Sequence, residues 1–369
     1  MVTQQKGYNL KMANTNFTNV KISGIVTVVP QIVKLIDDEI DLYGGNQKQI
    51  DRIKKSIGLD RRHVADADTT SVDLCEAAAR KLFKGLGLNK RDVDGLIFVT
   101  QTPDHFQPSN AAVIHGRLEL DSSCASFDIN LGCSGYVYGL WMAHMMVASG
   151  TCNKVLLLAG DTISKYVNPR DRSTAPLFGD AGSATLVEKT EVDTKSFFSL
   201  HTDGSGNDFI KVPAGGFRCP TTEKTTVEYE DTEGNWRSQN DLYMNGGEVF
   251  NFSIKIEPVA INEILKYSKK TIDDMDYIIF HQANKYIITN IAKRLKLPLD
   301  KVPCETVGKY GNQSSASIPS TINDALSIKL STSQQDIILS GFGVGLSWAS
   351  ASIVLDNIYC PTVQIYNKG

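Results

Sequence analysis

A cysteine between glycines is the clearest candidate for chemistry in this chain of 369 residues. Cys133 stands in the run GCSG, between a predicted buried strand, Ala125–Leu131, and a predicted apolar helix, Gly135–Ser149. At a helix start, unpaired backbone N–H groups and the helix dipole favour a thiolate. The sequence therefore predicts a nucleophile elbow with sulfur in place of oxygen. A buried core thiol beside packing glycines is the structural alternative from this segment alone.

Two polar residues follow strand-like runs in the second half of the chain. His281 follows the apolar run 277–280, and Asn312 lies in a glycine-flanked turn that enters a helix. Ligands bind at the carboxyl ends of strands where two α/β units meet, so we expect Cys133, His281 and Asn312 to share one cleft. Each residue also has a structural explanation when it is considered alone. His281 fits a hydrogen-bonded polar residue at a strand end, and Asn312 fits a turn residue that tolerates left-handed backbone geometry.

A glycine-rich run, GFGVGLSW (Gly341–Trp348), follows a further predicted strand. A dinucleotide site is disfavoured here because a strand, not a helix, is expected after the glycines. A tight glycine turn can instead direct backbone N–H groups into a cleft, as an oxyanion hole requires.

The elements that must position these residues are repeated along the chain. Asp92–Thr102 is matched by Asp274–Asn284, and Lys154–Thr162 by Asp336–Val344; Val93 and Met275 lie 182 residues apart, as do Lys154 and Asp336. A third pair of strand-like runs, SATLVEK and SASIVLD, closes each half. Alternating strands and helices indicate sheets with helices packed on them. We therefore predict duplicated α/β units in a five-layer αβαβα arrangement.

The repeat divides the chain into three predicted parts. Residues 1–19 are expected to form a polar tail, 20–195 the half with the nucleophile, and 196–369 the half with His281 and Asn312. No linker separates the halves, so one compact body is expected. Asp203–Asn240, rich in glycine, proline and charge, is predicted to be a surface loop and insertion.

Composition excludes several classes of function. The net charge of −3 gives no global field for nucleic acid or anionic membranes, and no run has the roughly 18 apolar residues of a membrane span. The N-terminus lacks the apolar core of a signal peptide. Seven cysteines without CxxC spacing indicate reduced thiols and a cytoplasmic protein, and no Cys/His cluster has zinc-like spacing. We therefore expect no metal site.

Several ordered motifs together resemble β-ketoacyl-acyl-carrier-protein synthase III, from about residue 21 to 355. They are GCSG, NPRDRST…FGDAGSA, HQAN, KYGNQSSASIP and GFGVGLSW. The resemblance implies the thiolase fold, a homodimer and a catalytic triad of Cys133, His281 and Asn312. It also implies an oxyanion hole from the backbone N–H groups of Cys133 and Val344.

The reaction implied by the resemblance is a decarboxylative Claisen condensation. An acyl thioester of coenzyme A or of an acyl carrier protein acylates the cysteine, malonyl-acyl-carrier protein is decarboxylated, and a β-ketoacyl thioester is released. This chemistry uses no metal or redox cofactor. The alternative is an acyltransferase of the same fold that moves the acyl group to oxygen or nitrogen; a carrier-protein-binding module without catalysis is disfavoured by the complete triad.

The resemblance also assigns further residues. Substrate-binding positions are Phe342, Gly343, Gly246, Arg172 and Gln107, and carrier-protein docking falls to Lys285, Lys293 and Arg294. Four positions depart from the family pattern, and one of them is Ser56, which stands where the family usually has arginine. Arg52 stands where a tryptophan often stacks on coenzyme A, Tyr286 replaces a docking arginine, and Gln107 replaces a phenylalanine. These departures favour an acyl-carrier-protein donor and a specialised paralogue.

Overall fold

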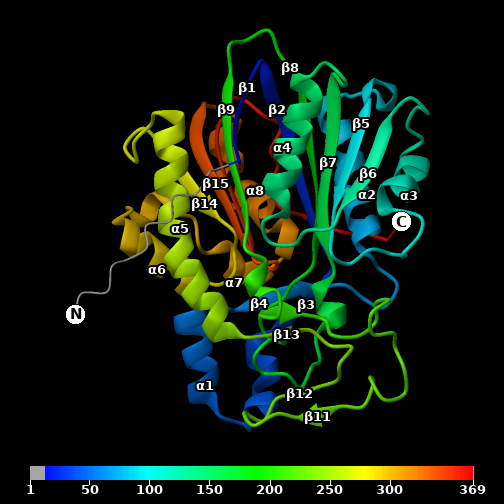
Figure 1. Cartoon of the computed structure of the whole chain (residues 1–369), viewed down its shortest axis with the longest axis vertical. Helices are drawn as coiled ribbons and strands as arrows, with labels where there is room; N and C mark the ends of the chain where they lie inside the picture. The colour runs from blue at the N-terminus through cyan, green and yellow to red at the C-terminus, as the bar shows by residue number, and fades with distance from the viewer. Residues whose placement is uncertain (1–12, 369) are drawn as a thin grey trace.

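Two large β-sheets form the framework of the protein (Figure 1). The computed structural model describes residues 13–368. The six-stranded sheet has the order β17 (Gln364–Ile365), β2 (Val20–Val29), β8 (Ala181–Lys189), β7 (Lys154–Asp161), β5 (Gly95–Val99) and β6 (Ala125–Ile129). The five-stranded sheet has the order β1 (Ala13–Thr18), β9 (Lys195–Thr202), β16 (Ser347–Leu355), β15 (Gln335–Gly343) and β14 (Tyr277–Phe280).

The strand pairing confirms the predicted duplication. In the first sheet β5 runs parallel to β7, and β7 runs antiparallel to β8. In the second sheet β14 runs parallel to β15, and β15 antiparallel to β16. The equivalent strand starts Gly95 and Tyr277 keep the predicted separation of 182 residues. The carboxyl ends of the parallel strands in both sheets therefore point toward the same region, and the candidate residues follow in this region.

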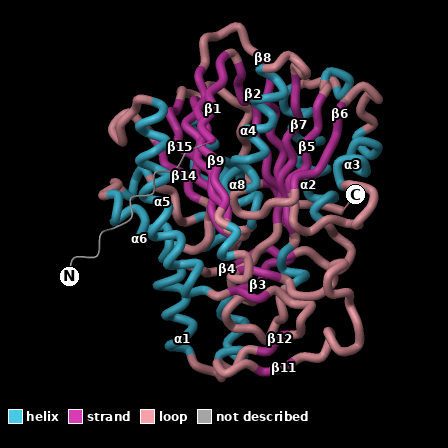
Figure 2. The backbone as a smooth tube through the Cα atoms, in the orientation of Figure 1, coloured by secondary structure: helices cyan, strands magenta, loops and turns pink. Residues whose placement is uncertain are grey.

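Helices cover both sheets and fill the space between them, giving the expected αβαβα layers (Figure 2). On the six-stranded sheet lie α2 (Ser71–Leu86) and α3 (Asn110–Leu118); on the five-stranded sheet lie α5 (Gly246–Ser268) and α6 (Lys285–Leu295). Between the sheets lie α4 (Gly135–Ala148) and α8 (Ser317–Leu330). Helix α4 is apolar on every face because both sheets pack against it.

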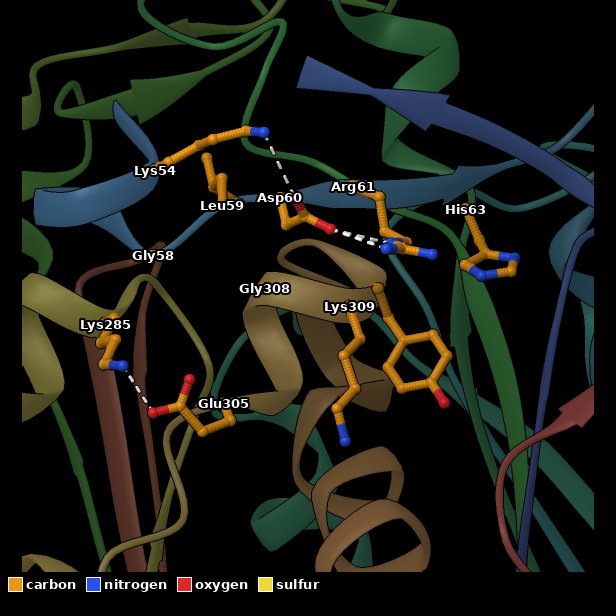
Figure 3. Close-up of a pocket in the computed structure, with 11 residues that line it drawn as sticks. Lys54, Gly58, Leu59, Asp60, Arg61, His63, Lys285, Glu305, Gly308 and Lys309 are labelled. Atoms are coloured by element: carbon orange, nitrogen blue, oxygen red, sulfur yellow. Dashed lines mark hydrogen bonds and ion pairs between the residues drawn. The ribbon is translucent and has the colours of Figure 1, made fainter. Parts of the chain in front are cut away.

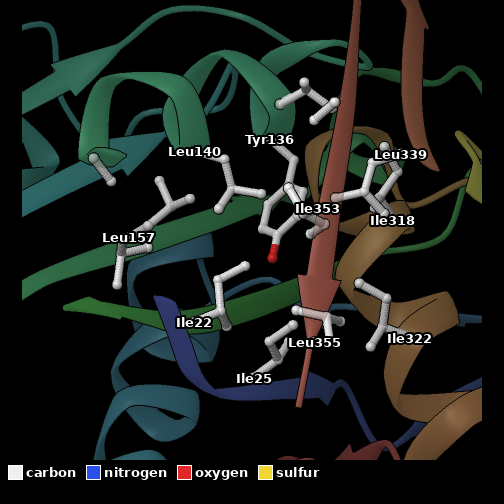
Figure 4. Close-up of a cluster of buried hydrophobic side chains, with 14 of the residues drawn as sticks. Ile22, Ile25, Tyr136, Leu140, Leu157, Ile318, Ile322, Leu339, Ile353 and Leu355 are labelled. Atoms are coloured by element: carbon white, nitrogen blue, oxygen red, sulfur yellow. The ribbon is translucent and has the colours of Figure 1, made fainter. Parts of the chain in front are cut away.

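The central core joins the two halves (Figure 4). Tyr136 and Leu140 of α4 and Ile318 and Ile322 of α8 are fully or almost fully buried with Leu339 of β15. The Tyr136 hydroxyl is hydrogen-bonded to Thr185 at 2.9 Å, so its one polar atom is satisfied inside this core. Burial of such large side chains stabilises each by roughly 1.5–3 kcal/mol. The layer that carries Cys133 is thereby held rigidly between the sheets.

The remaining elements are short, and several of the strands lie together with the helix 47–52 at one end of the molecule (Figure 2). The strands are β3 (Ile32–Leu35), β4 (Arg61–Val64), β10 (Ile210–Lys211), β11 (Tyr229–Glu230), β12 (Trp236–Arg237) and β13 (Tyr243–Met244). The helices are α1 (Gln47–Arg52) and α7 (Thr306–Tyr310), with short 3₁₀ segments at 36–43, 90–92, 163–166, 204–206, 299–301 and 314–316 and a π segment at 53–57.

The predicted division at the termini needs correction. Part of the predicted tail, Ala13–Thr18, is strand β1, paired antiparallel with β9 in the second half's sheet; residues 1–12 lie outside the described part. Conversely, β17 near the C-terminus pairs with β2 in the first half's sheet. Each half therefore contributes a terminal strand to the sheet of the other. Pairing between such distant segments leaves no local signal in a polar hexapeptide such as ANTNFT.

Candidate active site

Cys133 lies on the turn between β6 and α4, as the sequence predicts. The Gly135 N–H donates to the Gly132 carbonyl at 2.7 Å, which closes the turn, and Ser134 precedes the first residue of the helix. Cys133 lines a cavity of about 740 Å³ that also contains His281 and Asn312. The predicted convergence of these three residues on one cleft is therefore present in the structure.

The ionisation of Cys133 differs from the expectation. Burial raises the pKa of the thiol to about 11, although hydrogen bonds with the backbone of Val344 and of Cys133 itself oppose the shift. Loss of hydration therefore outweighs the stabilisation offered by the helix start. At neutral pH the resting group is a thiol, and its proton must leave as the substrate is attacked.

His281 follows β14 and is almost completely buried, with 1% of its surface exposed. Its Nδ1 lies 2.6 Å from the Ser317 hydroxyl, whose oxygen also accepts from the Gln282 N–H at 3.3 Å. Since the Ser317 oxygen already accepts a hydrogen bond, we assign its own proton to Nδ1, an assignment that puts the ring proton on Nε2. Burial lowers the pKa of His281 to about 3. The imidazole is neutral at working pH and offers one N–H donor.

Asn312 is fixed in the orientation that makes it a donor as well. Its Oδ1 accepts from the Ser314 N–H at 3.0 Å, and its own backbone N–H donates to the Leu177 carbonyl at 2.8 Å. With Oδ1 occupied, Nδ2 is the side-chain atom left for a ligand. His281 and Asn312 therefore present two N–H donors to one cavity, an arrangement that stabilises a developing oxyanion.

The glycine-rich turn after β15 closes against the cysteine. A Cβ added to Gly343 would lie 2.7 Å from Cys133 Sγ, and one added to Gly341 would lie 2.7 Å from the Cys133 carbonyl oxygen. This close approach brings the Val344 backbone to the thiol. The Phe342 ring stands edge-on to His281, with centroids 5.8 Å apart at 85°. Phe342, Gly343 and Val344 all line the cavity.

Asp161, at the end of β7, ties the two halves together beneath the site. Its Oδ1 accepts from the Gln101 N–H at 2.7 Å, and its Oδ2 from the Ser315 N–H and hydroxyl at 3.1 and 2.7 Å. Ser134 and Ser347 make a second link, with their hydroxyl oxygens 2.7 Å apart. Sequence reasoning singled out none of these for a role, because only the fold brings their partners together.

The predicted insertion is more than a surface loop. Within Asp203–Asn240, a group of residues lines the cavity: Ile210, Lys211, Val212, Ala214, Gly215, Gly216, Thr221 and Asn240. Gly246, at the start of α5, lines it as predicted. From the first half, Gln101 and Asn130 line it too, and neither was predicted from the sequence. Gln101 lies two residues after β5 and Asn130 directly after β6, and this location at strand ends is the signal that could have identified them.

Two predicted substrate residues do not reach the cavity within the single chain. Arg172 Nη2 donates to the Glu233 carbonyl at 2.6 Å, and the residue is not part of the cavity lining. Gln107 is exposed and precedes Pro108 through a cis peptide bond. Its neighbour Phe106 lines the cavity instead.

The three candidate docking cations lie apart along α6. Lys285 begins the helix and is ion-paired with Glu305 at the edge of a second cavity of about 500 Å³ (Figure 3). Lys293 and Arg294 are exposed in the last turn, where Arg294 donates to the Ile254 carbonyl at 3.2 Å. The second cavity holds none of the triad. Its cations are paired with neighbouring carboxylates: Lys54 and Arg61 with Asp60, and Lys309 with Asp324.

Neither a membrane-spanning helix nor a metal-binding cluster is present in residues 13–368. No helix there is long and apolar enough to span a membrane. In the same residues, no group of three or more His, Cys, Asp or Glu side chains is arranged to hold a metal ion.

Comparisons with known proteins match most of the chain. The models described as 3-oxoacyl-[acyl-carrier-protein (ACP)] synthase III and its C-terminal part match residues 127–206 and 265–355. A putative 3-oxoacyl-[acyl-carrier-protein] synthase 3 of Campylobacter jejuni is 40% identical over 96% of this chain and 99% of its own. A beta-ketoacyl-[acyl-carrier-protein] synthase III of Caldanaerobacter subterraneus is 37% identical, over 80% of this chain and 86% of its own. The crystal structure of a 3-oxoacyl-(acyl-carrier protein) synthase from Burkholderia xenovorans is 37% identical and superposes with a TM-score of 0.89, over 96% of this chain and 99% of its own.

Proposed function

Because the chain belongs to the 3-oxoacyl-[acyl-carrier-protein] synthase III family, we propose that it condenses an acyl thioester with malonyl-acyl-carrier protein. The observation that carries the proposal is the shared cavity of one thiol and two fixed N–H donors, Cys133, His281 and Asn312. Neutral donors suit enolate formation, whereas transfer to oxygen or nitrogen calls for a general base.

In the first half-reaction Cys133 Sγ attacks the acyl thioester carbonyl. The backbone N–H groups of Cys133 and Val344 stabilise the tetrahedral oxyanion, and the Sγ proton leaves with the departing thiol. The products are acyl-Cys133 and free carrier thiol. The raised pKa of Cys133 makes this proton transfer part of the chemical step.

In the second half-reaction malonyl thioester enters with its carbonyl oxygen between His281 Nε2 and Asn312 Nδ2. Loss of carbon dioxide leaves an enolate, and both N–H donors stabilise its oxygen. The enolate carbon attacks the acyl-Cys133 carbonyl and releases Sγ, which takes a proton from water. The product is a β-ketoacyl thioester. The proposed steps use no metal or redox cofactor.

Carrier-protein recognition is proposed for the exposed end of α6. Lys293 forms no ion pair in the described part of the chain, and it lies beside Arg294. Exposed cations attract an acidic partner and raise its association rate. Lys285 is less available because Glu305 neutralises it. Charge reversal at Lys293 should therefore raise KM for malonyl-acyl-carrier protein more than reversal at Lys285.

We also propose a homodimer formed through β6. This strand is the edge of the six-stranded sheet, and Phe127 and Ile129 on it are only partly buried. An edge strand presents unpaired N–H and C=O groups to a second copy. Light scattering after gel filtration tests the dimer; a monomer at micromolar concentration contradicts it.

We also propose a cytoplasmic location. The seven cysteines are all free, as is usual for proteins of a reducing compartment.

The proposed reaction is tested by turnover of acyl thioesters with malonyl-acyl-carrier protein. We expect equal amounts of carbon dioxide and β-ketoacyl product, and no product from Cys133→Ser. Acyl transfer to a hydroxyl or amine acceptor without carbon dioxide release would favour the alternative acyltransferase. Normal turnover by Cys133→Ser would contradict both.

A further inference from the structure

The cavity wall next to the nucleophile carries two amide side chains, Gln101 and Asn130. Gln101 lies just beyond the end of β5 and Asn130 directly follows β6, two strands that run side by side and parallel. The pairing of Val99 with Ile129 places both residues at the same edge of the sheet. Cys133 comes three residues after Asn130 on the same segment. Both amide side chains therefore line the side of the cavity that carries Cys133.

The Gln101 side chain lies directly against the cysteine turn. A Cβ built on Gly132 would be 2.2 Å from Gln101 Oε1, so the amide is packed against the residue that precedes Cys133. The Gln101 backbone is anchored by its N–H bond to the buried Asp161 carboxylate. The Gln101 backbone is therefore fixed relative to the cysteine turn, and its side-chain amide lies against that turn.

Neither amide group has a hydrogen-bond partner among the residues that the structure describes. The Gln101 backbone N–H donates to Asp161, but its side-chain amide and that of Asn130 make no hydrogen bond within residues 13–368. Both carboxylate oxygens of the neighbouring Asp161, in contrast, accept hydrogen bonds. A polar group that lines a cavity without a protein partner loses its hydration when an apolar chain is bound there. Such a wall is a poor surface for a purely alkyl group.

The reactive geometry indicates which part of the substrate meets these amides. The malonyl carbonyl must lie between His281 and Asn312, which come from the second half of the chain. The acyl group on Cys133 must leave that space free. Gln101 and Asn130 come from the first half and adjoin the cysteine turn. They line the same cavity on segments that adjoin the nucleophile, which favours contact with the acyl chain over contact with the malonyl group.

We propose that the acyl group accepted by Cys133 is a hydroxyacyl group with its hydroxyl at the third or fourth carbon, and this rests on the proposed condensation. An amide offers both donor and acceptor, which matches a hydroxyl. A carboxylate is disfavoured because, among residues 13–368, Lys211 is the one lysine or arginine that lines the cavity, and it is ion-paired with Asp208 at 2.8 Å. Asn130 is exposed in the single chain and adjoins the β6 edge that the proposed dimer would enclose.

The test compares substrates of equal size that differ in one group. The pairs are 3-hydroxybutyryl against 3-methylbutyryl thioester, and 4-hydroxybutyryl against pentanoyl thioester, each condensed with malonyl-acyl-carrier protein. We expect kcat/KM to favour the hydroxyacyl member of at least one pair by about 10-fold or more. Gln101→Met and Asn130→Leu keep similar size and remove the hydrogen bonds. Each should lower that ratio about 5- to 10-fold, because the hydroxyacyl member loses a hydrogen bond that the alkyl member never makes.

Equal or better use of the alkyl members by the wild-type enzyme would overturn the inference while the condensation stands. A hydroxyacyl preference that both variants retain would overturn the assignment to Gln101 and Asn130. Failure of every thioester to acylate Cys133 is the separate result that removes the proposed function, and the inference with it.

Discussion

Replacing Asn312 by aspartate keeps the size of the side chain and exchanges its amide NH2 group for a charged oxygen. The Ser314 N–H already occupies Oδ1, so aspartate keeps that contact and the side-chain size. What changes is the second atom, where the Nδ2 donor becomes a carboxylate oxygen. That oxygen repels the enolate it should stabilise.

The expected loss from Asn312→Asp follows from the role of a single oxyanion donor. Removing one such donor costs about 3–4 kcal/mol, or about 10²- to 10³-fold in rate. The added negative charge makes this a lower bound for decarboxylation. Acylation of Cys133 uses the backbone N–H groups of Cys133 and Val344, so it should stay near the wild-type rate.

Two measurements separate these half-reactions. Acylation of Cys133 is followed by intact mass, and decarboxylation by carbon dioxide released from malonyl-acyl-carrier protein. Asn312→Ala is the control that removes the donor without adding charge, and its loss should be smaller. Wild-type carbon dioxide release by Asn312→Asp, or an equal loss in both half-reactions, would refute the reasoning.

Four further predictions follow from the same structure. Burial raises the pKa of the Cys133 thiol to about 11, so its alkylation by iodoacetamide should accelerate about tenfold per pH unit and continue to accelerate past pH 9. A rate that stops rising below pH 8.5 would contradict this. Malonyl decarboxylation by Cys133→Ala should show no inflection between pH 5 and 8, because the pKa of His281 is lowered to about 3 and the neutral ring prevails throughout. Gly343→Ala should lose acylation of Cys133, because the added Cβ would lie 2.7 Å from Sγ; Gly246→Ala, whose added Cβ meets open space, should be acylated and should unfold at the wild-type temperature. Equal acylation of the two variants would contradict the packing. Asp161→Asn should lower the free energy of unfolding by about 1–3 kcal/mol in urea, since one acceptor becomes a donor facing buried donors; an unchanged midpoint contradicts this.

The repeat and the triad were predictable from sequence because both leave local patterns. Strand runs recur at a fixed separation, and Cys133, His281 and Asn312 each occupy a strand end or a glycine turn. Strand β1 was missed because its partner β9 lies far along the chain and its own residues are polar. Edge strands of this kind carry a weak hydrophobic pattern.

The ionisation of Cys133 and the amide wall required the folded structure. The helix start predicts a lowered thiol pKa, but burial depends on packing from both halves and reverses the sign. Gln101 and Asn130 are ordinary polar residues in the sequence, and their unused amides become visible only once the cavity is formed. The segment 203–240 was predicted as a surface loop and insertion, but it contains three short strands and lines the cavity, and both features depend on tertiary contacts.

Intact mass of the protein tests the central claim most directly. The protein is incubated with a panel of acyl-coenzyme A and acyl-carrier-protein thioesters, and malonyl-acyl-carrier protein is then added. A mass gain located on Cys133 that disappears on malonyl addition, with release of a β-ketoacyl product, is the predicted result. Stable acyl-Cys133 that malonyl thioester leaves unchanged, or no acylation by any donor, would contradict the proposed condensation.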